Sequence, residues 1–242
     1  MTEDRRPGEA AKKTGETAGK PHYAGHRGRL RERFLRDLGA SMEDYEILEM
    51  LLALALPRVD TKPIAKDLLA RFGNLAAVIS ADPVDLAKTK GIKEAAVVPI
   101  KLVQTAALRL AQQQVMEQPV ISSWDNLISY LHIAMSREKV EHLRLLFLDN
   151  KNRLIADEVQ QRGTVNHTPL YPREVMKRAL DLHASALILV HNHPSGDPTP
   201  SKDDIHMTNE IRDAAEKLGI RLHDHIIIGR TEQTSFKAEG LL

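Results

Sequence analysis

The chain has 242 residues, with 34 lysines and arginines against 33 aspartates and glutamates, a formal net charge of +1 and 42% hydrophobic residues. This composition predicts one or two ordinary soluble domains and excludes a wholly disordered chain. The sequence contains no cysteine, which excludes disulfides, catalytic thiols and thiolate metal sites. Any metal ion must therefore be bound by His, Asp or Glu.

The N-terminal segment, residues 1–22, is rich in Lys, Glu, Gly, Thr and Ala and has almost no large apolar side chains. Such a segment cannot repay the entropy of ordering, so we expect a disordered tail. No apolar run approaches the roughly 18 residues of a membrane span, and the charged start lacks the apolar stretch of a signal peptide. We therefore expect a cytoplasmic protein that does not associate with membranes.

Residues 23–115 are predicted to form a small all-helical domain. Apolar side chains recur at helical spacing over residues 25–40, 45–56, 62–71, 75–79 and 95–114. Proline and glycine interrupt this pattern at Pro57, Gly73, Asp82-Pro83 and Gly91. The polar segment 112–119, which ends in proline, predicts the boundary to a second unit that begins near Val120.

Two features of this helical region point towards nucleic acid. Residues 86–96 resemble the hairpin of a helix-hairpin-helix module, whose turn amides meet DNA phosphates. Lys93 stands where such modules have their second glycine, and Glu94 beside it would repel a phosphate. The arginines between 27 and 36 can add phosphate contacts, although a solvated helix face explains them equally. Weak DNA binding through this domain is therefore one expected interaction.

Residues 120–242 predict an α/β domain in which helices flank a mixed sheet. A helix at 124–134 precedes two apolar or alternating runs, 142–148 and 154–159, that predict a β-hairpin. Further helices are predicted at 171–183 and 201–218, and further strands at 186–190 and 220–228.

The strongest candidate site follows the apolar strand at 186–190. His191 and His193, two residues apart at its end, project to the same side. Ser201 opens a helix whose first turn would bring Asp204 back towards them. Two imidazoles and one carboxylate are a usual ligand set for catalytic zinc, which leaves a fourth position for a water whose pKa falls to about 7. The structural alternative is that Ser201 and Asp204 only form a capping box.

This run is similar to the JAMM motif of MPN-domain metalloproteases and, more narrowly, to the RadC (UPF0758) family. The resemblance rests on GTVN at 163–166, YPREV at 171–175, ALILVHNHPSGDPTPS at 186–201, DHIIIG at 224–229 and the ending SF followed by EGLL. It spans residues 120–242, and the helical region 25–115 also resembles the family's N-terminal part. The resemblance implies a cytidine-deaminase-like α/β fold and Zn²⁺ held by His191, His193 and Asp204. It also implies that Ser201 positions the water and assists the reaction oxyanion.

The resemblance further implies a general base upstream, and Glu158 in ADEVQQRGTVN matches that place. A carboxylate there can take a proton from the zinc-bound water and return it to the leaving amine. Without the resemblance, Glu158 is an exposed glutamate of the hairpin. Gln160 and Gln161 depart from the apolar or aromatic pair of the family, which leaves the aim of Glu158 open.

His223 and His225 form a second pair with one residue between them, inside the strand at 220–228. Alternation predicts that both lie on one face of that strand. We expect a structural role or contact with the metal ligands rather than a second metal site. The remaining histidines that we considered have no partner at ligand spacing: His142, His167, His183 and His206.

These patterns predict a zinc-dependent hydrolase, a metallopeptidase whose substrate is a protein or peptide with a peptide or isopeptide amide. One alternative is a DNA-repair-associated protein whose metal domain is structural or acts on nucleic acid. A scaffold without activity is another. A His-His-Asp set favours zinc over the carboxylate-rich Mg²⁺ sites of nucleases.

Overall fold

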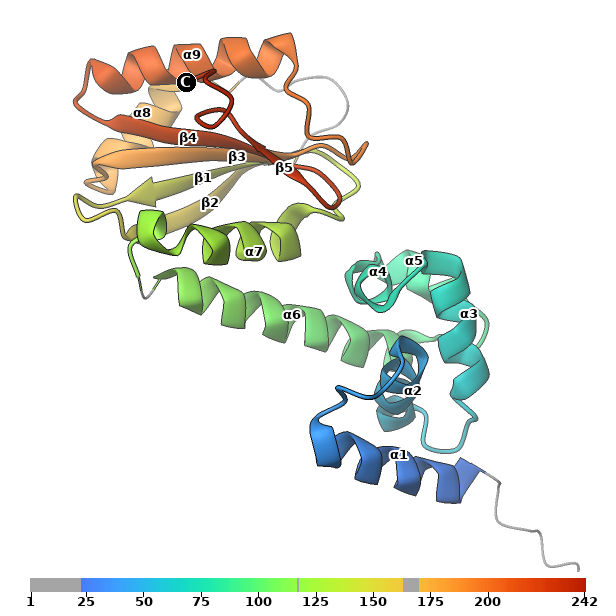
Figure 1. Ribbon diagram of the computed structural model, residues 1–242. Coiled ribbons are helices and arrows are strands. Elements are labelled where there is room, and N and C mark those ends of the chain that lie inside the picture. Colours follow the sequence, from blue (N-terminus) through green and yellow to red (C-terminus); the bar gives the residue numbers. More distant parts are fainter. Residues whose placement is uncertain (1–22, 117, 163–169) are drawn as a thin grey trace, which may run out of the picture.

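The computed structural model describes residues 23–116, 118–162 and 170–242 (Figure 1). The predicted tail, residues 1–22, lies outside the described residues, as do His167 and the GTVN motif at 163–166.

The N-terminal region is helical, as predicted. Its elements are α1 Tyr23–Asp37, α2 Asp44–Ala55, α3 Lys62–Phe72, α4 Leu75–Ser80, α5 Pro83–Ala87 and α6 Glu94–Met116. Asp82-Pro83 interrupts the helical pattern as predicted: α4 ends before it, Asp82 caps α5 and Pro83 begins it. The Asp82 carboxylate accepts a hydrogen bond from the Val84 amide at 2.8 Å, and Pro83 occupies the first helical position, where a missing N–H costs nothing.

Two arginines of α1 fasten this helix to the rest of the helical region. Arg27 donates to the carbonyl oxygens of Leu56 at 3.1 Å and Pro57 at 2.5 Å, directly after α2. Arg33 pairs with Glu46 at 2.8 Å. Both guanidinium groups are therefore engaged within the fold, and the arginine-rich face offers fewer phosphate contacts than its sequence suggests.

Helix α6 joins two apolar cores. Its first turns bury Ala96 and Ile100 in the core of the helical region. The helix then runs to Met116, through most of the segment 112–119 that we interpreted as a boundary, and buries Val115 in the core under the sheet.

The C-terminal region contains a mixed sheet with the strand order β2-β1-β3-β4-β5. The strands are β1 His142–Leu148, β2 Leu154–Arg162, β3 Ala186–Asn192, β4 Arg221–Ile228 and β5 Gln233–Ser235. β1 is antiparallel to both β2 and β3, β3 and β4 are parallel, and β5 is antiparallel to β4. The predicted hairpin and mixed sheet are confirmed, whereas β5 is too short to leave an alternating pattern in the sequence.

Helices cover both faces of this sheet (Figure 1). The elements are η1 Val120–Ser123, α7 Trp124–Met135, α8 Pro172–Asp181 and α9 Lys202–Glu216. On one face α6 and α7 pack over Leu146, Ile188 and Ile226. On the other face α8 and α9 pack over Leu145 and Leu189. Because β1, β3 and β4 are buried on both sides, their sequences are almost continuously apolar, and the predicted α/β fold is confirmed. Within the described ranges, no helix combines the length and the apolar character that crossing a membrane requires.

A buried ionic cluster links α7 to the hairpin. Arg144 of β1 donates to both carboxylate oxygens of Asp157 on β2 at 2.7 Å, and the Tyr130 hydroxyl of α7 donates to the same carboxylate. Burial and the Asp157 charge raise the pKa of Tyr130, so its hydroxyl stays protonated. The Asp157 side chain is only 3% exposed.

We expect Asp157→Ala to lower the free energy of unfolding by about 3 to 5 kcal/mol, because it leaves the Arg144 guanidinium buried without a counter-charge. Urea denaturation followed by circular dichroism measures this loss. Asp213→Ala, which removes a carboxylate of 61% exposure, is the control and should change stability by less than about 0.5 kcal/mol. Equal effects of the two substitutions would contradict the prediction.

Candidate metal centre

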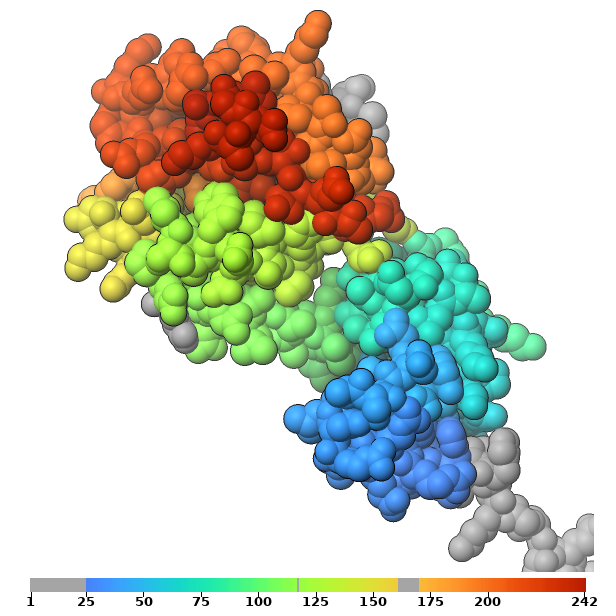
Figure 2. Space-filling view, in the orientation of Figure 1, coloured from blue at the N-terminus to red at the C-terminus, as the bar shows by residue number. Residues whose placement is uncertain are grey.

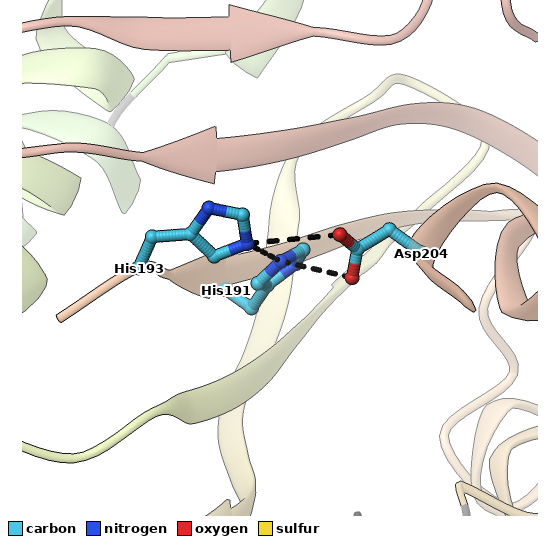
Figure 3. A group of neighbouring side chains, drawn as sticks. All are labelled: His191, His193 and Asp204. Carbon is cyan, nitrogen blue, oxygen red and sulfur yellow. Dashed lines mark hydrogen bonds and ion pairs between the residues drawn. The ribbon is translucent and has the colours of Figure 1, made fainter. Parts of the chain in front are cut away.

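Three predicted ligands converge where β3 ends (Figure 3). The two Nε2 atoms of His191 and His193 lie 3.0 Å apart. Nε2 of His191 lies 3.2 Å from Oδ1 of Asp204, and Nε2 of His193 lies 3.6 Å from Oδ2. The ligand atoms of a tetrahedral zinc ion, each about 2.0 Å from the metal, are about 3.3 Å apart. The three side chains therefore have the spacing of a shared ion, and together they form a candidate metal site.

A tight loop between β3 and α9 produces this convergence. The His193 amide donates to the Ile228 carbonyl at 3.0 Å, which ties the loop to the end of β4. Gly196 adopts a φ of +91°, the left-handed conformation that favours glycine. A Cβ atom at Gly229 would lie 2.6 Å from the Gly196 carbonyl oxygen, so only glycine lets β4 end directly beneath the loop.

The first turn of α9 holds Asp204 in place through a capping box. Oδ2 of Asp204 accepts hydrogen bonds from the Ser201 hydroxyl at 2.6 Å and from the Ser201 amide at 2.8 Å. The Asp204 amide donates in return to the Ser201 hydroxyl at 3.1 Å. The structural alternative from the sequence is thus present, and it aims the carboxylate at the histidines. Capping and metal binding are compatible here, because the capping box holds the Asp204 carboxylate where it also faces the two histidines.

A buried chain of hydrogen bonds assigns the tautomer of His191. The Thr208 hydroxyl donates its single proton to the Asp204 carbonyl at 2.5 Å, so at 2.6 Å it can only accept from Nδ1 of His225. Burial lowers the pKa of His225 well below its ordinary value, so this ring is neutral and its Nε2 accepts. The donor to Nε2 is Nδ1 of His191, 2.8 Å away. The lone pair of His191 therefore lies on Nε2, the atom that faces the other two ligands.

His193 reaches the same state through the loop. Its Nδ1 lies 2.7 Å from the Asp197 carbonyl, which can only accept, so the lone pair of the neutral ring is again on Nε2. Two imidazole lone pairs and a carboxylate then face one another, an arrangement that needs a cation at its centre.

The electrostatics of the ligands show that this centre favours a positive charge. Burial opposes the charge of Asp204, but its contacts with His191 and His193, which can donate only when a proton occupies Nε2 in place of a metal ion, outweigh burial and hold the pKa of this carboxyl well below its usual range. The Asp204 carboxylate in turn raises the pKa of His193 against the effect of burial. Both shifts favour a negative carboxylate next to a positive charge.

We expect His225→Ala to weaken zinc binding about 10- to 100-fold, because Nδ1 of His191 loses the acceptor that orients the ring. Competition with a chromophoric chelator measures the affinity. His206→Ala is the matched control, because it removes an imidazole of α9 that is 77% exposed. An unchanged affinity in His225→Ala would show that the relay does not tune the site.

His223 lies on the other face of the sheet, away from the candidate metal site. The register of β3 and β4 shifts at Leu187, and His223 is inserted as a β-bulge. Its Nε2 lies 2.7 Å from Oδ1 of Asn152, and its ring lines a groove beside α7. The prediction that both histidines share a face is wrong, because an inserted residue reverses the alternation. His225 contacts His191 as expected.

The structure does not bring Glu158 next to the three ligands. Glu158 opposes Leu145 of β1, which in turn opposes Leu189 of β3, so it shares the α8 and α9 face with His191. Two strand spacings, about 10 Å, separate β2 from β3. Arg178 of α8 binds the Glu158 carboxylate at 2.5 to 3.0 Å and lowers its pKa.

We did not predict from the sequence that Thr208 takes part in the site. The sequence signal is its position four residues after Asp204, on the same side of α9. Nothing in that spacing reveals that His225, from a different strand, completes the contact.

Comparison with known proteins identifies the family to which this chain belongs. Residues 121–241 match the family described as RadC-like JAB domain. A UPF0758 protein of Rhodobacter capsulatus is 58% identical over 213 residues, which are 88% of this chain and 100% of the relative. A UPF0758 protein of Ruegeria pomeroyi is 54% identical over 217 residues, which are 90% of this chain and 97% of the relative. This chain, with its His-His-Asp site at the end of β3, therefore belongs to the RadC-like JAB-domain family, UPF0758.

Proposed function

We propose that this protein is a zinc-dependent hydrolase that cleaves a peptide or isopeptide amide. One observation carries the proposal: the lone pairs of His191 and His193 and the Asp204 carboxylate face one centre, with ligand separations of 3.0 to 3.6 Å. Nitrogen and carboxylate donors in this number are typical of catalytic zinc, which keeps one position open. Octahedral Mg²⁺ sites instead gather oxygen ligands.

A bound zinc ion supplies a Lewis acid that lowers the pKa of water to about 7 and polarises the substrate carbonyl. The residues of the chain provide orientation and proton transfer. The His225 and Thr208 contacts keep the His191 ring in position. The Ser201 hydroxyl donates to Asp204 at 2.6 Å, and it is proposed to turn this proton to the oxyanion of the reaction when substrate binds.

Glu158 is proposed as the general base that takes a proton from the attacking water and returns it to the leaving amine. The hydrogen bond from Arg178 lowers the pKa of Glu158, which keeps the carboxylate ionised but makes it a weaker base while the ion pair persists. The assignment requires that the carboxylate leaves Arg178 and approaches the ligands when substrate binds. Catalytic hydrogen bonds often form only in the substrate complex, which is compatible with the observed ion pair.

Hydrolysis assays test this function. Tag-free, zinc-loaded protein is incubated with a library of internally quenched peptides and with isopeptide-linked substrates. We expect cleavage that a chelator abolishes and added zinc restores. If zinc-containing protein cleaved neither class, the hydrolase proposal would fail and a metal-binding scaffold would remain.

We also propose weak DNA binding by the hairpin between α5 and α6. Its turn at Gly91 has a φ of +86°, and the side chains of Lys90 and Lys93 beside it are exposed. Retention of the full chain on duplex DNA should fall with salt, and Lys90→Gln with Lys93→Gln should weaken it. Retention that is equal in wild type and variant would exclude this hairpin.

A further inference from the structure

A groove of about 670 Å³ lies between the helical region and the sheet. The sheet side contributes the segment after α7, Arg230 after β4, and Pro194, which directly follows the candidate ligand His193. The helical side contributes α4, α5 and α6. Figure 2 shows the segment after α7 against the surface of the helical region. Because Pro194 forms part of its wall, a polypeptide bound in the groove would lie beside the candidate metal site.

Most charges of the groove already have partners. Lys139 pairs with Asp85 across the groove. Lys101 donates to the carbonyl oxygens of Ile79 at 3.1 Å and Ala81 at 2.6 Å, next to the end of α4. These two lysines hold the groove together and are not available for a ligand.

Arg137 and Arg230 differ from the lysines. Among the described residues, neither guanidinium group has an ion pair or a hydrogen bond to a neighbour. Both arginines line the groove, and burial together with the charge of Arg230 lowers the pKa of Arg137. The Arg230 amide donates to the Gly196 carbonyl at 3.0 Å, and its side chain packs on Gly196 in the metal-binding loop. Arg230 therefore connects the groove with the loop that carries His193, and Arg137 lines the same groove.

We infer that Arg137 and Arg230 bind a carboxylate of the polypeptide substrate, next to the amide that is cleaved. The inference rests on the proposed hydrolase function. Guanidinium groups recognise carboxylates through paired, charge-assisted hydrogen bonds, and an anion between two like charges removes their repulsion. The carboxylate belongs either to an acidic side chain or to the C-terminus of the substrate.

The other charges of the groove argue against nucleic acid as the ligand. Asp82, Asp85 and Glu138 also line it. A phosphate backbone carries charge along its whole length and would meet these carboxylates. A single carboxylate needs only the arginine pair as its partner and does not have to extend along the acidic part of the groove.

Fluorescence anisotropy with three labelled peptides of equal length tests the inference on the full, zinc-loaded chain. The first peptide has acidic side chains and an amidated C-terminus, the second has neutral side chains and a free C-terminus, and the third is neutral and amidated. We expect at least one carboxylate peptide to bind about tenfold more tightly than the third. Which of the two binds identifies the source of the carboxylate.

Arg137→Gln and Arg230→Gln should each remove about tenfold of that preference. Arg137→Lys and Arg230→Lys keep the charge and should retain part of it, because lysine lacks the planar fork. Arg212→Gln on α9, which removes an arginine that pairs with Asp213, is the charge-matched control and should leave binding unchanged. Circular dichroism verifies that each variant is folded.

Three results would overturn the inference: equal binding of all three peptides, equal loss in the groove and control variants, or displacement of the peptide by an oligonucleotide at lower concentration than by unlabelled peptide. The test does not depend on turnover. Carboxylate binding without any hydrolysis would refute the proposed function and leave this subsite, whereas hydrolysis without a carboxylate preference would refute only the subsite.

Discussion

Asp204→Asn is expected to remove the metal ion from the purified, tag-free protein. We expect about one zinc per chain in the wild type and less than about a tenth of that in the variant, because an amide oxygen is a neutral and much weaker ligand than a carboxylate. The shape of the side chain is kept, so its oxygen can still accept from Ser201 and α9 remains capped. Elemental mass spectrometry measures the metal directly. His193→Ala, which removes a second ligand, should have the same effect.

Asp213→Asn is the matched control, since it neutralises a carboxylate of the same helix that pairs with Arg212 on the surface. It should retain the zinc of the wild type. A wild-type protein that bound no metal, even after reconstitution with zinc, would refute the hydrolase proposal. DNA binding by the hairpin between α5 and α6 would then be the better-supported function.

Glu158→Gln is expected to keep the zinc ion and to lower turnover of a cleaved substrate by at least about a hundredfold, the usual contribution of a general base. The glutamine has the size of the glutamate but cannot accept the proton. Metal content and kcat, measured on the same preparation, separate loss of the base from loss of the ion.

Arg178→Gln is the decisive control for Glu158. It breaks the same ion pair, whose side chains are 44% and 27% exposed, and leaves the carboxylate in place. Both substitutions should change stability by less than about 1 kcal/mol, because such exposed pairs contribute little. If turnover fell equally in the two variants, Glu158 would serve only to hold β2 against α8, and the base would be another group.

The local part of the site could be predicted from the sequence because it lies within one strand, one loop and the first turn of one helix. The spacing of His191 and His193 on β3 places both rings on one side, and the Ser201 cap turns Asp204 towards them. Backbone geometry alone sets these distances. The buried strands were equally evident, since elements covered on both faces have continuous apolar sequences.

The tertiary structure decided what depends on contacts between distant segments. The bulge at His223 reversed the face of one histidine, and the packing of α9 on β4 brought Thr208 to His225. Neither is visible in the sequence, because strand register and helix placement result from the packing of the whole core. The same holds for Arg137 and Arg230, which are far apart along the chain and line one groove only because the two regions lie against each other. The sequence by itself therefore determined which residues can bind a metal ion, whereas the fold determined the tautomers that aim them and the charges that surround them.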